Sequence, residues 1–542
     1  MNQAQTYFGI QMASNNRPTF VEHIELFRKD RNRDLLCCNL RGVERETLRV
    51  TTKGNISHKK HPNKLGSALT HPLITTDYSE ALLEFITDPY PKIDDLLNQL
   101  GNTHSFTAAN LQDGELLWPC SMPCTLDSDD DVPIAQYGKS NVGMMKTIYR
   151  RGLGHRYGRK MQAIAGVHFN FSVPDAVWSS LRTHCSSLLS LQDFKTEGYL
   201  KLVRNFRRRF WLLLYLMGAS PVTHASFVKG REHDLEKLGT EDVYLPYATS
   251  LRMGDLGYQS TAQDALYVCY NSIQTYLETL QKAIVEQYKP YEGINCTGNA
   301  DERQQLSAAV LQIENEFYST IRPKQTARSG ETQLKALKER GVEYIEVRCV
   351  DINPFDPLGI DESQIRFLEM FLLACLFDES PETNSNEYIE ILANQRKVVR
   401  EGRNPGLMLQ KSGESISLKC WAGELMDQLS PIADILDSLK GNDAYTSVLN
   451  TMKQRVQNPD LCPSAKLLEE MRDADQSFID WSMNKAREHR QVYLQKKLSV
   501  STQTSFERLS EISLGKQKEI ESTENQPLES YIQNYFDQYR QL

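Results

Sequence analysis

Four short stretches of this chain carry acidic, histidine and arginine side chains at spacings that suit metal-ion chemistry. The first is residues 41–50, RGVERETLRV, where strand-forming residues and the absence of proline predict a β-strand. Side chains alternate along a strand, so Glu44 and Glu46 share one face. Two such carboxylates repel each other unless a cation lies nearby or the edge is exposed. Taken alone, this stretch is equally well explained as a solvated strand of mixed charge.

The second acidic stretch is residues 75–87, TTDYSEALLEFIT. As a strand, it would place Glu80 and Glu84 on one face. As a helix, it would bring together Asp77 and Glu84, which are seven residues apart. The ending EFIT favours a strand for at least the second half. Either structure adds two more acids to the first pair.

The third stretch is residues 166–173, GVHFNFSV, which divides cleanly into two faces. One face is wholly apolar, and the other carries His168, Asn170 and Ser172. Such a strand packs its apolar side on helices and leaves a polar floor above. A lone histidine is more often a satisfied hydrogen-bonding residue, but beside four acids we favour a metal-ligand role for His168.

The fourth stretch is residues 342–354, VEYIEVRCVDINP, whose alternation puts Glu346 and Arg348 on the same face. The two could form a simple ion pair between strands. In the context of the other three stretches, we interpret Glu346 as a metal ligand and Arg348 as a clamp for phosphate oxygens.

Two polar segments between these stretches add further candidates. Residues 312–330 are predicted to form a loop with Tyr318, Arg322 and Lys324, and a cationic loop near an acidic metal site suits a phosphate chain. Residues 249–258 are predicted to form a loop that supplies Arg252 and Tyr258. The motif GKS at 138–140 lacks the glycine that a P-loop requires, so ATP must be bound in another way.

The rest of the chain supplies the elements that position these side chains. Helices are predicted over 92–115, 192–217, 262–288 and most of 361–495. Residues 1–35 are expected to be a variable helical lead-in, and 496–542 a polar tail that is either partly helical or mobile. The apolar runs 210–217 and 367–377 are too short to span a membrane, and no signal peptide is indicated, so we expect a cytoplasmic protein.

Composition narrows the class further. A net charge of −8 over 542 residues argues against nucleic acid as a partner. The eleven cysteines show neither zinc nor disulfide spacing, which is consistent with reduced thiols. Acids on a sheet, one histidine and nearby arginines suit several Mg²⁺ ions that hold a nucleoside triphosphate. The residues themselves therefore predict a Mg-ATP-dependent transferase or ligase.

A family resemblance is more specific than this class. The segments RGVERETLRV, WPCSMPC, AQYGKSN, GVHFNFS, YLPYATSLRMGDLGY, LQIENEFY and YIEVRCVDINPF occur in this order. Together they resemble the proteobacterial (type 1) glutamate–cysteine ligases, from about residue 36 to about residue 475. The resemblance implies an α+β fold similar to that of glutamine synthetase, with a curved, mainly antiparallel sheet that forms a funnel wrapped by helices. It also implies a single catalytic domain over residues 36–495 and a monomer.

The activity implied is ligation of the L-glutamate γ-carboxylate to the L-cysteine amine through γ-glutamyl phosphate, the first step of glutathione synthesis. ATP would be the co-substrate, with two or three Mg²⁺ ions for which Mn²⁺ could substitute. The implied catalytic pair is Glu346 and Arg348. The implied metal shell is Glu44, Glu46, Asp77, Glu84, His168 and Glu346. ATP would meet Arg150, Arg322, Lys324 and Arg348, and the amino-acid substrates would meet Arg252, Tyr149, Tyr258 and Tyr318.

Two alternatives remain open at this stage. A related ligase could use the same sheet with a different amine acceptor. A non-enzymatic sensor of metal or nucleotide could keep the fold after losing activity, although the intact set of acids argues against that.

Overall fold

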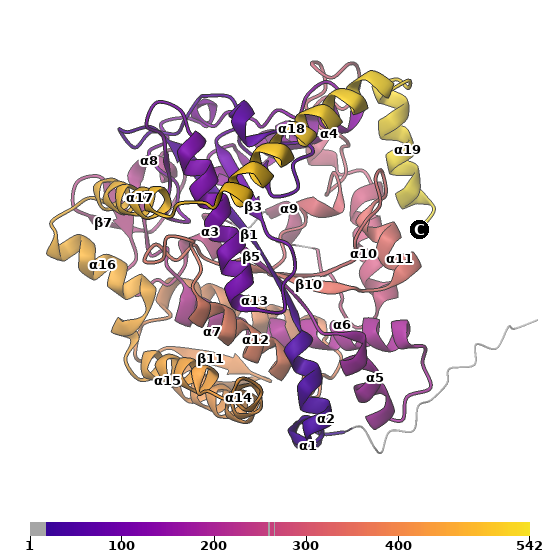
Figure 1. Cartoon of the computed structure of the whole chain (residues 1–542), viewed down its shortest axis with the longest axis vertical. Coiled ribbons are helices and arrows are strands. Elements are labelled where there is room, and N and C mark those ends of the chain that lie inside the picture. The colour runs from indigo at the N-terminus through magenta and orange to yellow at the C-terminus, as the bar shows by residue number, and fades with distance from the viewer. Residues whose placement is uncertain (1–17, 258–260, 265) are drawn as a thin grey trace, which may run out of the picture.

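An antiparallel sheet of seven strands lies at the centre of the computed structural model, which describes residues 18–257, 261–264 and 266–542 (Figure 1). The strand order is β2-β3-β1-β5-β10-β9, and β4 pairs with the end of β1. The strands are β1 (Leu40–Val50), β2 (Ile74–Thr76), β3 (Leu82–Ile86), β4 (Leu116–Leu117), β5 (Val167–Ser172), β9 (Ile321–Lys324) and β10 (Tyr344–Val350). The central position of β1 and β5 puts the acidic and histidine-bearing stretches side by side.

The two faces of the sheet differ as the alternation predicts. On β5, Val167, Phe169 and Phe171 are buried in the main hydrophobic core, whereas His168 and Asn170 point to the opposite face. Burial of such aromatic and branched side chains holds the sheet to the helices beneath it. The opposite face is therefore the polar floor that the sequence predicts.

Helices surround the sheet. They are α1 (Phe20–Arg28), α2 (Asp30–Arg33), α3 (Ile93–Asn110), α4 (Asn141–Tyr157), α5 (Asp175–His184), α6 (Leu191–Arg209), α7 (Trp211–Met217), α8 (Ala225–Val228), α9 (Thr261–Asp264), α10 (Ile273–Val285), α11 (Gln333–Arg340), α12 (Glu362–Phe377), α13 (Ser385–Glu401), α14 (Leu418–Lys440), α15 (Ala444–Gln457), α16 (Pro463–Asp473), α17 (Phe478–Gln495), α18 (Val500–Thr523) and α19 (Leu528–Arg540). All seven residues of α7 are buried, in keeping with the apolar run from which we predicted it.

Two small sheets complete the architecture. One contains β6 (Val222–His224), β7 (Glu236–Leu238) and β8 (Asp242–Tyr244), and the other is the hairpin of β11 (Met408–Lys411) and β12 (Glu414–Ser417). We did not predict this hairpin, which interrupts the helical region after residue 361. The predicted class, α+β with a mainly antiparallel sheet wrapped by helices, is confirmed.

Two local predictions are corrected by the structure. Residues 75–87 are not one continuous strand, because a turn separates β2 from β3. Glu80 lies in that turn, where its carboxylate accepts hydrogen bonds of 2.8 Å from the main-chain N–H groups of His61 and Gln136. The predicted loop at 312–330 contains the strand β9, which lies at the sheet edge, where Pro323 is tolerated.

The chain ends lie on the helical shell. Within the described part of the N-terminal segment, α1 and α2 precede the sheet, in keeping with a helical lead-in. Residues 496–542, which the sequence left either helical or mobile, form α18 and α19 and pack on the body of the protein (Figure 1). Phe506 of α18 stacks on Phe106 of α3, with ring centroids 4.9 Å apart.

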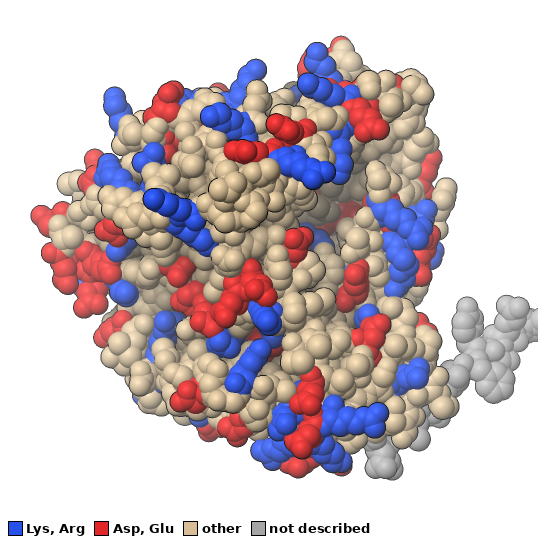
Figure 2. All heavy atoms as spheres, in the orientation of Figure 1, with Lys and Arg blue, Asp and Glu red and all other residues tan. Residues whose placement is uncertain are grey.

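Basic and acidic side chains are interspersed over the face shown in Figure 2. Within the described ranges, no helix combines the length and the apolar character that a bilayer crossing requires.

Candidate active site

The pairing register of three strands brings four predicted ligands together. Glu44 of β1 lies opposite His168 of β5, and Glu46 of β1 lies opposite Glu84 of β3. The Nδ1 atom of His168 lies 3.1 Å from a carboxylate oxygen of Glu44, and its Nε2 atom lies 3.5 Å from one of Glu46. One ligand atom each from Glu44, Glu84 and His168 fall within 4.8 Å of one another. This is a donor set that could hold a metal ion.

Glu346 and Arg348 of β10 extend the cluster. The guanidinium of Arg348 donates a 2.8 Å hydrogen bond to Oε1 of Glu346, and that oxygen lies 3.7 Å from Nδ1 of His168. The ammonium group of Lys324, on the edge strand β9, lies 3.6 Å from the other oxygen of Glu346. Acidic and cationic side chains therefore meet on one face of the sheet, as the alternation of residues 342–354 predicts.

The carboxylates are too crowded to ionise independently. Burial and the charges of Glu44, Asp77 and Glu46 raise the pKa of Glu84 well above its usual value. Burial also raises the pKa of Glu46. For Glu346, burial acts in the same direction but is outweighed by the charges of Lys324, Arg348 and His168, which hold its pKa well below the usual value. A divalent cation among these groups would relieve the repulsion.

Some potential ligand atoms of the cluster have no hydrogen-bond partner, which also fits a metal ion. The Nε2 atom of His168 and the Oε2 atom of Glu346 are both buried and make no hydrogen bond. Buried polar atoms without a partner are costly, and they commonly indicate a ligand, an ion or a water molecule. Carboxylate oxygens are the preferred ligands of Mg²⁺, and an imidazole nitrogen is a common ligand for Mn²⁺ and other transition metals.

Asp77 and Arg150 lie beside the cluster and contact each other. Asp77 occupies the turn after β2, and its carbonyl oxygen accepts a hydrogen bond from Nε of Arg150 on α4. The guanidinium of Arg150 stacks over the ring of Tyr137, 4.6 Å from its centroid. The charge of Asp77 also contributes to the raised pKa of Glu84. Both residues are thus close to the acids, on the side of β3.

The predicted substrate residues have diverse environments. Arg252 is fully buried and donates a 2.9 Å hydrogen bond to the carbonyl oxygen of Arg348. This contact joins Arg252 to the main chain of β10. Tyr318 accepts a 2.8 Å hydrogen bond from Gln162, and Tyr149 lies on α4 next to Arg150. Tyr258 lies outside the described residues. Arg322 donates to the carbonyl oxygens of residues 315 and 317, which fixes the chain just before β9.

Two further residues of the cluster escaped the sequence analysis as functional candidates. Asn170 donates a 2.9 Å hydrogen bond to Oε1 of Glu44, and the main-chain N–H of Gly166 donates a 2.6 Å hydrogen bond to Oε2 of Glu46. Asn170 shares the polar face of its strand with His168, which was a usable signal. The sequence around Gly166 contained no such signal. In the structure, a Cβ atom at this position would lie 2.0 Å from the guanidinium of Arg252, so no larger residue fits there without a shift.

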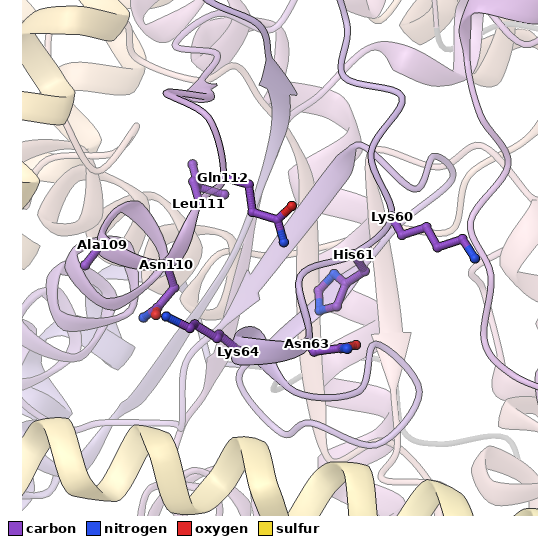
Figure 3. A pocket seen from close by; sticks show the side chains of 8 residues that line it. All are labelled: Lys60, His61, Asn63, Lys64, Ala109, Asn110, Leu111 and Gln112. Atoms are coloured by element: carbon purple, nitrogen blue, oxygen red, sulfur yellow. The ribbon is translucent and has the colours of Figure 1, made fainter.

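A separate cavity of about 350 Å³ is lined by other residues, which Figure 3 shows. Residues 60, 61, 63, 64 and 109–112 line it, and they include Lys60, His61 and Lys64. None of its lining residues belongs to the acidic cluster, so the cluster, and not this cavity, is the candidate active site.

Acids, an imidazole and guanidinium groups on one face of an antiparallel sheet define an enzyme that handles phosphorylated substrates. Residues 24–398 match the model of the glutamate–cysteine ligase family. The chain is 49% identical over 512 residues to the glutamate–cysteine ligase of Saccharophagus degradans, covering 94% of this chain and 96% of the relative. It is 46% identical over 504 residues to that of Pseudomonas aeruginosa, covering 93% and 95%. The chain belongs to the glutamate–cysteine ligase family.

Solved structures agree with this assignment. The crystal structure of glutamate–cysteine ligase from Francisella tularensis, in complex with AMP, superimposes with a TM-score of 0.87 at 36% identity, over 93% of this chain and 98% of that one. A bifunctional glutathione synthetase from Pasteurella multocida shares the fold, with a TM-score of 0.72 at 23% identity over 90% and 58% of the two chains. The chain is thus an enzyme that joins glutamate to cysteine in the first step of glutathione synthesis, which confirms the predicted activity.

Proposed function

We propose that the acidic cluster binds two or three Mg²⁺ ions, with Mn²⁺ as a possible substitute, and that ATP is the co-substrate. The observation that carries this proposal is the convergence of Glu44, Glu84 and His168 ligand atoms within 4.8 Å. Glu46, Asp77 and Glu346 would complete the metal shell. The ions would neutralise phosphate charge and hold the triphosphate in line for transfer.

The residues of the chain have distinct tasks in the first half-reaction. The γ-carboxylate of glutamate attacks the γ-phosphorus of ATP, which gives γ-glutamyl phosphate and ADP. Arg348 presents a planar pair of N–H donors to phosphate oxygens, and Glu346 fixes its orientation through their 2.8 Å hydrogen bond. Lys324, Arg150 and Arg322 add positive charge around the phosphates. No protein nucleophile is needed.

In the second half-reaction, the amine of cysteine attacks the acyl phosphate and releases phosphate. Tyr149, Tyr258 and Tyr318 border the cysteine pocket in this proposal, and Arg252 helps to hold glutamate. Exclusion of water matters here because the acyl phosphate is easily hydrolysed. The family resemblance supports these assignments, together with the position of Tyr149 beside Arg150 on α4.

The same proposal extends to the domain bounds, oligomeric state, location and partners of the enzyme. We propose that residues 36–495 form the catalytic domain and that the protein works as a monomer in the cytoplasm. Its partners are the small molecules L-glutamate, L-cysteine and ATP, with neither nucleic acid nor membrane among them.

A coupled assay of ADP release tests the proposal. ADP release at the full rate should require glutamate, Mg²⁺ and cysteine together, and EDTA should abolish it. Replacing cysteine with other amines should lower the rate strongly. Faster turnover with another amine would favour the related carboxylate–amine ligase, and ADP release that persists in EDTA would refute the metal site.

A further inference from the structure

Residues 496–542, the C-terminal arm, attach to the body of the enzyme through both of their helices. The arm consists of α18 and α19, and in Figure 1 it crosses the top of the molecule and descends beside α10 and α11. The family match ends at residue 398, so it does not extend to the arm. Three of its attachments lie at elements that carry or adjoin the proposed site residues.

The first attachment joins α18 to the loop before β2. The N–H of Ser67 donates a 2.9 Å hydrogen bond to the hydroxyl of Ser513, and the hydroxyl of Thr70 donates a 2.6 Å hydrogen bond to the carbonyl oxygen of Ser513. Gly66 has φ +83°, and a Cβ atom there would lie 2.9 Å from the Cα atom of Ser510. The loop and the helix therefore approach each other backbone to backbone.

The second attachment holds the beginning of α4. The carboxylate of Glu524 accepts a hydrogen bond from the N–H of Asn141, the first residue of α4, and Glu521 accepts one of 2.8 Å from the N–H of Lys139. The side chain of Asn141 donates a 2.8 Å hydrogen bond to the carbonyl oxygen of Gln526. A carboxylate at a helix N-terminus satisfies free N–H groups and complements the helix dipole.

The third attachment is an apolar seat for α19 on α4. Ile532 is buried in a cluster with Met145 and Ile148 of α4 and with Leu306. Tyr149, which we assign to the cysteine pocket, packs against this same cluster, as does Tyr535 of α19. The arm thus contacts α4 at two places, the N-terminus of the helix and one of its sides. The same helix carries Tyr149 and Arg150.

Tyr539 extends this attachment to the segment that precedes Tyr318. Its side chain is fully buried, and its hydroxyl donates a hydrogen bond to Oε2 of Glu314. The other carboxylate oxygen of Glu314 accepts a 2.6 Å hydrogen bond from the N–H of Gln333, where α11 begins. In addition, the side chain of Gln312 donates a 3.1 Å hydrogen bond to the carbonyl oxygen of Tyr149, which joins this segment to α4.

We infer that the C-terminal arm is a positioning element of the ligase and that α19 sets the relative placement of Tyr149 and Tyr318. Both tyrosines depend on elements that α19 contacts, one through Ile532 and the other through Tyr539 and Glu314. Their link to cysteine rests on the proposed function. Loss of an α19 contact therefore acts on the cysteine step more than on glutamate or ATP.

Steady-state kinetics of two variants of the full chain test the inference. Tyr539→Phe removes only the hydroxyl and leaves a buried carboxylate oxygen of Glu314 without its donor. Ile532→Ala weakens the apolar seat without touching the polar network. Each is expected to raise the KM for cysteine about fivefold or more, with the KM for glutamate and for ATP within about twofold of wild type.

Phe506→Ala is the matched control in the same arm. It removes the stack on Phe106 of α3, a residue outside the apolar cluster that seats α19, and should lower the melting temperature with an unchanged KM for cysteine. If the α19 variants lose stability or kcat with an unchanged cysteine KM, or if Phe506→Ala raises that KM equally, the inference is overturned. A cysteine KM that rises in Tyr539→Phe but not in Tyr149→Ala or Tyr318→Ala refutes the pocket assignment and leaves the role of the arm standing.

Discussion

Glu46 on β1 lies directly opposite Glu84 on β3, so two carboxylates face each other within the interior of the sheet. Like charges at directly opposed positions of a sheet destabilise it. Burial and neighbouring carboxylates, Glu46 among them, raise the pKa of Glu84, so the charged form of this carboxyl group is disfavoured unless a cation lies nearby. This pair is therefore a second structural argument for a bound cation, beside the convergence of Glu44, Glu84 and His168.

Glu84→Gln should lower ligation by several orders of magnitude. The amide cannot replace an anionic metal ligand, and the transferred phosphoryl group loses its counter-charge. In metal-free buffer, the variant should be at least as stable as wild type, because the repulsion with Glu46 and Glu44 is relieved. Steady-state kinetics measure the loss of ligation, and thermal melts with and without Mg²⁺ measure the change in stability. The stabilisation by Mg²⁺ should be smaller in the variant than in wild type.

Glu80→Gln is the matched control for that experiment. Glu80 lies in the same hairpin, but its two oxygens accept main-chain hydrogen bonds and do not face the cluster. We expect lower stability with an unchanged response to Mg²⁺. Near-normal turnover of Glu84→Gln at saturating Mg²⁺ would remove Glu84 from the metal shell.

Arg348→Lys should behave as a loss and not as a conservative change. A guanidinium can donate to Glu346 and bridge phosphate oxygens at the same time, whereas an ammonium group offers no planar fork. We expect kcat to fall by at least about tenfold, with ATP as the varied substrate. Arg340→Lys, at the surface ion pair with Glu331, is the control and should keep wild-type kinetics. Equal rates for Arg348→Lys and wild type would reduce Arg348 to an ion-pair partner.

Tyr318→Ala should impair the use of cysteine far more than that of glutamate or ATP. If γ-glutamyl phosphate forms before cysteine attacks, its own α-amine can displace phosphate and close the ring of 5-oxoproline. The variant should therefore release ADP and 5-oxoproline slowly while it makes little dipeptide, as mass spectrometry of the products would show. Tyr318 also packs against Tyr157, with centroids 5.6 Å apart, so a purely structural role is the competing explanation. Equal loss of every activity together with a lower melting temperature would support that explanation.

His71 should make the free energy of unfolding fall as the medium becomes acidic. Its Nδ1 atom accepts hydrogen bonds of 3.1 and 3.0 Å from the N–H groups of residues 73 and 74, and burial lowers its pKa to about 4. Between pH 6.5 and 4, the unfolded chain binds a proton that the folded chain does not, so stability is lost as pH falls through this window. The loss amounts to about 3 kcal/mol at most.

The comparison of wild type with His71→Asn isolates this effect. Asparagine can accept the same main-chain hydrogen bonds but does not titrate, so its stability should decline less between pH 6.5 and 4. Other groups act on both proteins alike: burial raises the pKa of Asp242 and of Asp356 to about 6, which favours the folded state at low pH. Parallel denaturation curves across this range for the two proteins would contradict the role of His71.

The acidic cluster was predictable because strand alternation is a local property of the sequence. The shared face of Glu44 and Glu46, and that of Glu346 and Arg348, follows from residue spacing alone. The register that sets Glu44 opposite His168 does not, because it depends on pairing between segments 124 residues apart. Sequence therefore supplied the candidate ligands, and the fold supplied their distances.

The differences between the sequence-based predictions and the structure also have physical reasons. Proline, serine and glycine in 312–330 suggested a loop, but β9 lies at the sheet edge, where a proline costs no essential ladder hydrogen bond. Arg252, which the resemblance assigns to glutamate, is fully buried and bonded to the main chain of Arg348, a contact that residue spacing alone does not reveal. The polarity of residues 496–542 left a helix and a mobile tail both open, and a few apolar and aromatic side chains suffice to seat the two helices found there.

The strand order has a consequence for how the enzyme acquires activity during synthesis. His168 on β5 lies 180 residues before Arg348, and β5 pairs directly with both β1 and β10. A nascent chain can form the pair of β1 and β5 early, but the phosphate-binding half of the floor cannot join until residue 350 has left the ribosome. Closure of such a long segment is entropically costly and slow. We therefore expect the cluster with Glu346 and Arg348, and with it the full capacity to bind phosphate, to form only late in folding, whereas the ligand set of Glu44, Glu84 and His168 can assemble earlier.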